Sequence, residues 1–169
     1  NKWYLIEKIN GLTVSTLYLS GLLTTNTLKH IMNTIKRIQT TDINELDINV
    51  NIYSNYLNKL ERRYNNYDYS RFENSKKMYN ELNKELKEYE DKDKGEKVII
   101  HGDPVFTNII INKYEKIKLI DMRGIQGKKL TLLGDYLYDW SKLYQSLIGY
   151  DKILIGKEVN KKYEVEMIS

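Results

Sequence analysis

The segment HGDPVFTN occupies residues 101–108 and lies between two runs of branched apolar residues, VII at 98–100 and III at 109–111. Short apolar runs bounded by polar residues are typical of buried strands. A polar turn between two strands needs only a pair such as Asn-Gly or Asp-Gly. This connection places a histidine, an aspartate and an asparagine at fixed offsets, so it carries more chemistry than a turn requires.

Asp103 and Asn108 are five residues apart in this segment, and Asp121 ends the next apolar run, IKLID at 117–121. A carboxylate can take the proton of an attacking hydroxyl, and an amide oxygen with a second carboxylate can hold magnesium. These groups are the minimum set for transferring a phosphoryl group from ATP. The catalytic loop of protein kinases has the same Asp-to-Asn offset, followed by a magnesium-binding Asp after a β-hairpin. The pattern therefore predicts phosphoryl transfer, with ATP and Mg²⁺ as cofactors.

Other chemistries fit the sequence less well. Two-metal phosphoesterases generally draw on several histidines, whereas this chain has only His30 and His101. The segment GIQGKKLT at 124–131 contains a Gly-Lys pair but lacks the GxxxxGK[ST] spacing of a phosphate-binding loop.

Hydrophobic periodicity predicts helices before the central strands. A helix over 28–38 has residues at 24–26 as candidate caps, and two more helices are predicted over 52–64 and 71–90. The apolar residues of the first are Leu28, Ile31, Met32, Ile35 and Ile38, and those of the last are Met78, Leu82, Leu86 and Tyr89. The polar segment DKDKGEK at 91–97 then separates helices from strands.

The remaining segments predict a short strand near the start of the chain, a hairpin turn and a final helix. WYLIEKI at 3–9 resembles a strand that ends at Asn10-Gly11, and KYEK at 113–116 predicts a hairpin turn. A final helix within 134–149 begins after Asp135, a candidate cap. Its expected apolar face consists of Leu137, Trp140, Tyr144, Leu147 and Ile148.

The net charge is small, because 27 basic and 23 acidic residues give +4. A nucleic-acid footprint needs basic residues clustered on one face, so we expect no nucleic-acid partner. We expect no membrane partner either. Cysteine is absent, which excludes disulfides and thiolate sites. No secretion signal is recognisable near residue 1, and no apolar run approaches the ~18 residues of a membrane span. We therefore expect a cytoplasmic protein.

Three motifs follow one another between about residues 98 and 151: HGDPVFTN at 101–108, KLIDMRG at 118–124 and GDYLYDWSKL at 134–143. At these residues the chain resembles the aminoglycoside phosphotransferase and choline kinase family, the small-molecule branch of the kinase-like fold. Agreement through DMRG and GDYLYDWSKLYQSLIGYD is similar to the kinase-like domains of capsule and surface-polysaccharide biosynthesis proteins. A sugar nucleotidyltransferase often shares the polypeptide in those proteins.

The resemblance assigns roles to residues of the motifs. Asp103 would be the catalytic base, and Asn108 and Asp121 would be the magnesium ligands. His101 would brace the loop, and Asp139 would hold the loop backbone from the following helix, although a surface position on that helix is the alternative for Asp139.

Other positions keep two interpretations. The segment WYLIEKINGLTV at 3–14 resembles the hinge strand, whose backbone at Glu7 and Ile9 would meet the adenine. Arg123 would pair with phosphate, as guanidinium groups do, or neutralise Asp121. Five tyrosines would line a substrate pocket or pack in the core: Tyr53, Tyr56, Tyr64, Tyr67 and Tyr69.

A complete kinase also needs a loop that covers the phosphates and a lysine on an upstream strand. Neither is recognisable upstream of residue 101. We therefore expect an α+β chain that is the C-terminal lobe of a protein-kinase-like fold, mostly helical with a small catalytic β-hairpin, its N-terminal lobe largely missing. The expected division is a hinge strand and linker at 1–12 and a helical lobe at 13–169, with the catalytic loop at 98–124.

The function expected from these observations is an ATP-dependent kinase for a hydroxyl of a sugar, polyol or amino alcohol. The upstream lobe and a nucleotidyltransferase domain of the same polypeptide are the expected partners, and the 169 residues alone are expected to fold without turning ATP over. The alternative is a pseudokinase or scaffold lobe that binds partners without turnover. A basic nucleic-acid module is the third possibility, and it lacks the clustered patch.

Overall fold

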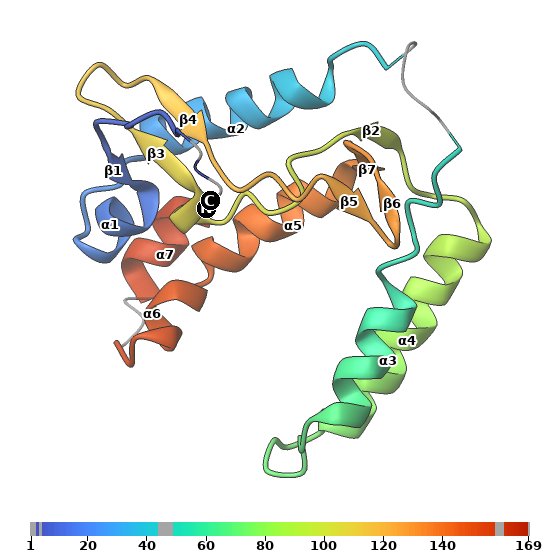
Figure 1. Ribbon diagram of the computed structural model, residues 1–169. Coiled ribbons are helices and arrows are strands. Elements are labelled where there is room, and N and C mark those ends of the chain that lie inside the picture. The colour runs from blue at the N-terminus through green and yellow to red at the C-terminus, as the bar shows by residue number, and fades with distance from the viewer. Residues whose placement is uncertain (1–2, 4, 44–48, 158–160, 169) are drawn as a thin grey trace. The chain divides into compact units, whose positions relative to one another are not determined.

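A computed structural model describes residues 3, 5–43, 49–157 and 161–168 (Figure 1). The chain is a mixed α+β protein with small sheets. Its contacts divide it into two compact units: unit 1 consists of Asn1–Ile38, His101–Arg123 and Asp139–Ser169, and unit 2 of Gln39–Ile100 and Gly124–Tyr138. The predicted α+β class is confirmed.

The sheet of unit 1 contains β1 (Leu12–Thr13), β3 (Ile109–Ile111) and β4 (Ile117–Leu119) in the order β1-β3-β4 (Figure 1). Both pairs are antiparallel, with Ile110 opposite Thr13 on one side and opposite Lys118 on the other. The turn between β3 and β4 is closed by Asn112, whose Oδ1 accepts the N–H groups of Tyr114 at 2.9 Å and Lys116 at 3.0 Å. The hairpin predicted around residues 113–116 is therefore confirmed.

Unit 1 also contains most of α2 and α5, and all of α1, α6 and α7. The bounds are α1 Val14–Leu19, α2 Thr25–Gln39, α5 Tyr136–Leu147, α6 Tyr150–Leu154 and α7 Lys161–Ile168. Thr24 caps α2, because its hydroxyl accepts the N–H of Thr27 at 3.1 Å. The helix predicted over 28–38 is confirmed. None of the helices in the described part of the chain has the length and apolarity that a membrane crossing requires.

The core of unit 1 is built around Tyr18 and Phe106, which are both fully buried. Their rings meet edge to face, with centroids 5.2 Å apart. The Tyr18 hydroxyl donates to the carbonyl of Leu147 at 2.8 Å and contacts a carboxylate oxygen of Glu164 at 3.1 Å. Apolar residues complete this core: Val14, Leu23, Leu28, Ile31, Ile35, Ile109, Ile111, Leu143, Leu147 and Met167. Because Phe106 belongs to the segment 101–108, the core fixes the middle of that segment.

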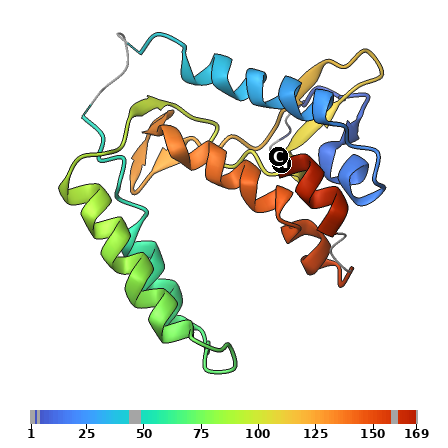
Figure 2. The same ribbon diagram turned by 180° about the vertical axis from the view of Figure 1, so that it is seen from behind.

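Unit 2 contains two short strand pairs and a helical hairpin. β2 (Lys97–Ile99) pairs with β7 (Leu133–Asp135), and β5 (Ile125–Gln126) pairs with β6 (Lys129–Leu130), both antiparallel. Helices α3 (Leu57–Asn66) and α4 (Ser75–Asp91) lie side by side (Figures 1 and 2). Neither helix has a buried residue along its described length.

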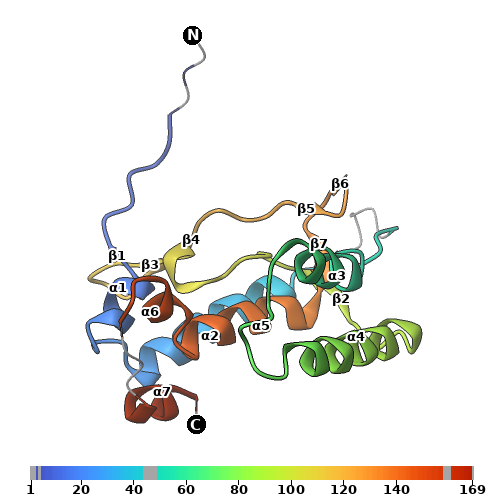
Figure 3. The same ribbon diagram turned by 90° about the horizontal axis from the view of Figure 1, so that it is seen from below.

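Several expected element boundaries differ from the structure, and the helix expected from residue 71 begins at Ser75. The helix expected from residue 52 begins at Leu57, because Asn51 first accepts the N–H of Tyr53 at 2.8 Å and forms a turn. The strand expected over 3–9 is not formed by the described residues of that stretch, and the first strand is β1 (Figure 3). The side chains of Trp3, Leu5 and Ile6 are at least 77 % exposed, so their apolar character reflects no packing within the described chain.

The buried face of α5 also differs from the expected one. Leu137, Tyr144 and Ile148 are about half exposed. The buried residues of the helix are Asp139, Leu143, Ser146 and Leu147. Of the five expected residues, Leu147 is buried and Trp140 is partly buried against the core. Periodicity missed Asp139 and Ser146 because these buried residues are polar.

Candidate active site

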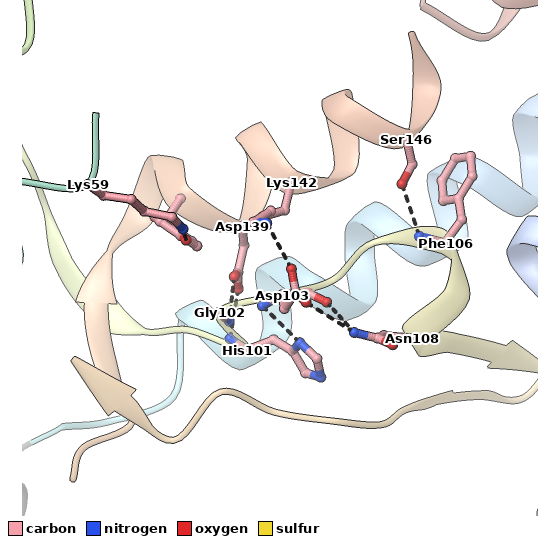
Figure 4. A network of polar contacts seen from close by, with 10 residues as sticks. Lys59, His101, Gly102, Asp103, Phe106, Asn108, Asp139, Lys142 and Ser146 are labelled. Carbon is pink, nitrogen blue, oxygen red and sulfur yellow. Dashed lines mark hydrogen bonds and ion pairs between the residues drawn. The ribbon is translucent and has the colours of Figure 1, made fainter. Parts of the chain in front are cut away.

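Asp139 anchors the start of the segment 101–108, which we call the HGD loop. The backbone N–H of His101 donates to Oδ2 of Asp139 and that of Gly102 to Oδ1, each at 2.8 Å (Figure 4). Asp139 is fully buried, which excludes the surface interpretation. Burial raises the pKa of Asp139, and the two N–H donors and the charge of Arg123 oppose that effect. The carboxylate and the turn therefore satisfy each other's buried polar groups.

Gly102 has a φ of +83°, the left-handed region in which a glycine is unstrained. A Cβ at this position would lie 2.7 Å from Cβ of Arg123 and 2.9 Å from its Nε. The backbone N–H of Arg123 donates to the carbonyl of His101 at 2.9 Å. Both backbone conformation and space therefore require glycine here, and Arg123 lies against the turn.

His101 is 1 % exposed, and its Nδ1 accepts the backbone N–H of Asp103 at 3.3 Å. Burial lowers the pKa of His101, and the charge of Asp139, the backbone of Ile120 and the charges of Asp103 and Asp121 oppose that effect. A neutral imidazole that accepts at Nδ1 carries its proton on Nε2. His101 thus braces the loop as a neutral ring.

The middle of the HGD loop is attached to the same helix as its start. The backbone N–H of Phe106 donates to Oγ of Ser146 at 3.1 Å, and both residues are fully buried. Asp139 and Ser146 are seven residues apart, which is about two helical turns and places them on one face of α5. The helix therefore holds the loop backbone at two points.

Asp103 and Asn108 are brought together by the turn between them. Asn108 Nδ2 donates to the carbonyl of Asp103 at 3.0 Å and lies 3.4 Å from its carboxylate Oδ2 (Figure 4). The other carboxylate oxygen, Oδ1, pairs with Nζ of Lys142 on α5 at 3.0 Å. Sequence reasoning did not single out Lys142, although it follows Asp139 by three residues and so lies about one helical turn further on.

Asp121 lies in the segment 120–123 that follows β4 and is hydrogen-bonded to the HGD loop. The backbone N–H of Ile120 donates to the carbonyl of Asn108 at 3.0 Å, and that of Arg123 donates to the carbonyl of His101 at 2.9 Å. Asp121 lies between these two contacts, is exposed and has a φ of +57°. The structure therefore brings the third predicted oxygen ligand to the same loop.

Among the described residues, no group of three or more His, Cys, Asp or Glu side chains could hold a metal ion. The predicted pair of Asn108 and Asp121 contains one carboxylate. Magnesium often takes only one or two protein ligands and completes its shell with water and substrate phosphates. The pair is compatible with that mode of binding.

The predicted adenine contacts lie along the stretch before β1. Glu7 pairs with Lys118 of β4 at 3.0 Å, with both side chains more than half exposed. Such a surface pair contributes about 0–1 kcal/mol. Ile9 is half-buried. Backbone contacts from Glu7 and Ile9 to a nucleotide stay a prediction.

Four of the five candidate pocket tyrosines make ring contacts within unit 2: Tyr53, Tyr56, Tyr64 and Tyr69. Oδ2 of the buried Asp135 accepts the hydroxyl of Tyr56 at 2.6 Å and that of Tyr89 at 3.0 Å. Oδ1 accepts the N–H of Leu137 at 3.3 Å, as expected of a helix cap. Burial, together with hydrogen bonding to Asp135, raises the pKa of Tyr56 and Tyr89. Tyr53 joins the cluster through ring contacts, so Tyr53 and Tyr56 serve packing.

Comparison of the chain with models of protein families, with curated proteins and with solved structures finds no match.

The Asp139 anchor can be tested by Asp139→Asn. An amide offers one acceptor oxygen and turns its NH₂ group toward the second backbone N–H, which leaves a buried donor unsatisfied at a cost of about 1–3 kcal/mol. Amide hydrogen exchange at His101 and Gly102, measured by NMR, should accelerate. Ser146→Ala is the matched control, since it should accelerate exchange at Phe106 alone. Unchanged protection of His101 and Gly102 in Asp139→Asn would show that Asp139 does not anchor the loop.

The requirement for glycine at position 102 can be tested by Gly102→Ala. The left-handed backbone costs an L-residue about 1–2 kcal/mol, and the collision with Arg123 adds to this loss. Gly21→Ala isolates the backbone effect, because Gly21 has a φ of +68° and a Cβ there would have no described atom beyond its chain neighbours within 4 Å. Urea unfolding should show the larger loss for Gly102→Ala. Equal losses in the two variants would exclude the steric part of the argument.

Proposed function

We propose that this chain forms the catalytic lobe of an ATP-dependent kinase that transfers the γ-phosphoryl group to a hydroxyl of a sugar, polyol or amino alcohol. The observation that supports it best is the arrangement of the HGD loop, which holds the Asp103 carboxylate beside the Asn108 amide. Asp121 follows Ile120, whose backbone N–H donates to the carbonyl of Asn108. This is the set of oxygen groups that phosphoryl transfer requires.

Asp103 takes the part of the general base in this proposal. Its side chain is 40 % exposed, so an acceptor hydroxyl can reach it from solvent. The carboxylate accepts the hydroxyl proton as the hydroxyl oxygen attacks the γ-phosphorus. The bond from phosphorus to the bridging oxygen of ADP breaks, and its electron pair stays on ADP.

Asn108 and Asp121 take the part of the magnesium ligands. The Asn108 amide is planar and turns its nitrogen toward Asp103, so its oxygen faces the opposite way. That oxygen and the exposed carboxylate of Asp121 are the hard donors that Mg²⁺ prefers. Bound magnesium supplies charge neutralisation at the nucleotide phosphates. Arg123, beside the turn, is the candidate for a further phosphate contact.

The resemblance to kinase-like domains of surface-polysaccharide biosynthesis supports an acceptor from glycan synthesis. In this proposal an upstream lobe of the same polypeptide supplies the lysine and the covering loop that position the phosphates. A pseudokinase lobe is the rival, and intact Asp103, Asn108 and Asp121 argue against it.

The proposal is tested by Asp103→Asn in the full-length gene product. General base catalysis contributes about 10²–10⁴-fold, so turnover should fall by that factor while the KM for ATP changes little. The measurement is a coupled kinase assay across a panel of sugars, polyols and amino alcohols. Asp91→Asn, at the exposed end of α4, is the matched control and should behave as wild type.

Two results would contradict the proposal. Wild-type turnover in Asp103→Asn would remove the base assignment. Absence of turnover in the wild-type protein on every acceptor, together with binding of a protein partner, would favour the pseudokinase.

A further inference from the structure

Lys142 reaches the HGD loop from α5 and pairs with the residue proposed as the base. Its Nζ lies 3.0 Å from Oδ1 of Asp103, and the lysine side chain is 25 % exposed (Figure 4). The pair is more shielded from water than the surface pair of Lys118 with Glu7, whose side chains are 54 % and 67 % exposed. A shielded ion pair interacts more strongly than an exposed one.

The two oxygens of the Asp103 carboxylate have different surroundings. Oδ1 is inaccessible to solvent and accepts no hydrogen bond from the described residues, and the ammonium group of Lys142 faces it as an ion pair. Within the described chain, the polar group beside Oδ2 is the Asn108 amide at 3.4 Å, which is a long and weak hydrogen bond. Oδ2 is therefore the oxygen that can receive a proton from an acceptor hydroxyl.

A carboxylate on a partly exposed side chain can otherwise rotate about both of its side-chain bonds. The backbone of Asp103 is fixed through His101, but that contact leaves the carboxylate orientation undetermined. Lys142 constrains the orientation of the carboxylate, because its ion pair with Oδ1 comes from the regular helix α5. Asp139, one turn earlier on the same helix, holds the backbone of the same loop.

We propose that Lys142 is a positioning residue for the base: it fixes Oδ1 of Asp103 so that Oδ2 faces the acceptor hydroxyl. This inference rests on the proposed kinase function. When Oδ2 takes the hydroxyl proton, Asp103 becomes neutral and the charge of Lys142 is no longer balanced by it.

The test compares Lys142→Gln and Lys142→Arg with Asp103→Asn in the full-length gene product. Misplacement of a reacting group by about 1 Å can cost on the order of 10²-fold in rate, so Lys142→Gln should lower kcat about 10- to 100-fold with little change in the KM for ATP. Lys142→Arg keeps the charge and should recover much of the loss. Lys29→Met, on an exposed position of α2, is the control and should match wild type.

A double variant separates positioning from a structural effect. If Lys142 acts through Asp103, adding Lys142→Gln to Asp103→Asn should not lower kcat further. Urea unfolding of each variant establishes that the folded fraction is equal. If Lys142→Gln does not fold, the comparison uses Lys142→Arg and Lys142→Met instead. The arginine variant must then have the higher kcat.

Three results overturn the inference. If Lys142→Gln keeps the wild-type kcat while Asp103→Asn is inactive, Lys142 has no positioning role and the kinase proposal stands. An equal fall in kcat in both backgrounds shows that Lys142 acts independently of Asp103. Absence of turnover in the wild-type protein removes the kinase proposal and this inference together.

Discussion

Two hydrogen bonds, from the backbone of His101 and Gly102 to the buried carboxylate of Asp139, determine the conformation of the HGD loop. A buried carboxylate is costly unless its oxygens are satisfied, and buried backbone N–H groups are costly unless they are paired. Each partner therefore removes the penalty of the other. The N–H groups of these two consecutive residues converge on one side chain, and the left-handed backbone of Gly102 turns the chain directly after them.

The chemistry of the loop follows from this anchor and from the core. Phe106 is fixed in the core beside Tyr18, and its N–H is held by Ser146. The chain turns between the two anchors and again through the 3-10 turn at Phe106–Asn108, which brings Asn108 into contact with Asp103. A polar helix face on one side and an apolar core on the other thus present a carboxylate and an amide at a defined separation. Such preorganisation of reacting groups is what phosphoryl transfer requires of a protein.

The sequence predicted the parts of the fold that local pattern controls. Hydrophobic periodicity predicts the helix at 25–39, and turn chemistry predicts the hairpin closed by Asn112. The buried face of α5 did not, because Asp139 and Ser146 are buried for their hydrogen bonds and periodicity counts only apolar residues. Lys142 was missed for a related reason: only the packing of α5 against the loop shows that this lysine meets Asp103. The strand β7 was not predicted because it pairs with β2, which is distant in the sequence, whereas β5 and β6 form a local hairpin with each other.

We propose that the HGD loop and the segment 120–123 after β4 hold a metal–nucleotide complex. Paramagnetic broadening by Mn²⁺ in place of Mg²⁺ tests it directly, since the effect detects weak complexes and reports distance from the metal. In NMR spectra of the ¹⁵N-labelled chain with ATP, the amide signals of Asn108 and Asp121 should broaden first, and excess Mg²⁺ should reverse the effect. Uniform broadening, or broadening first near the buried carboxylates Asp151 and Glu164, would show that the HGD loop does not hold the metal–nucleotide complex.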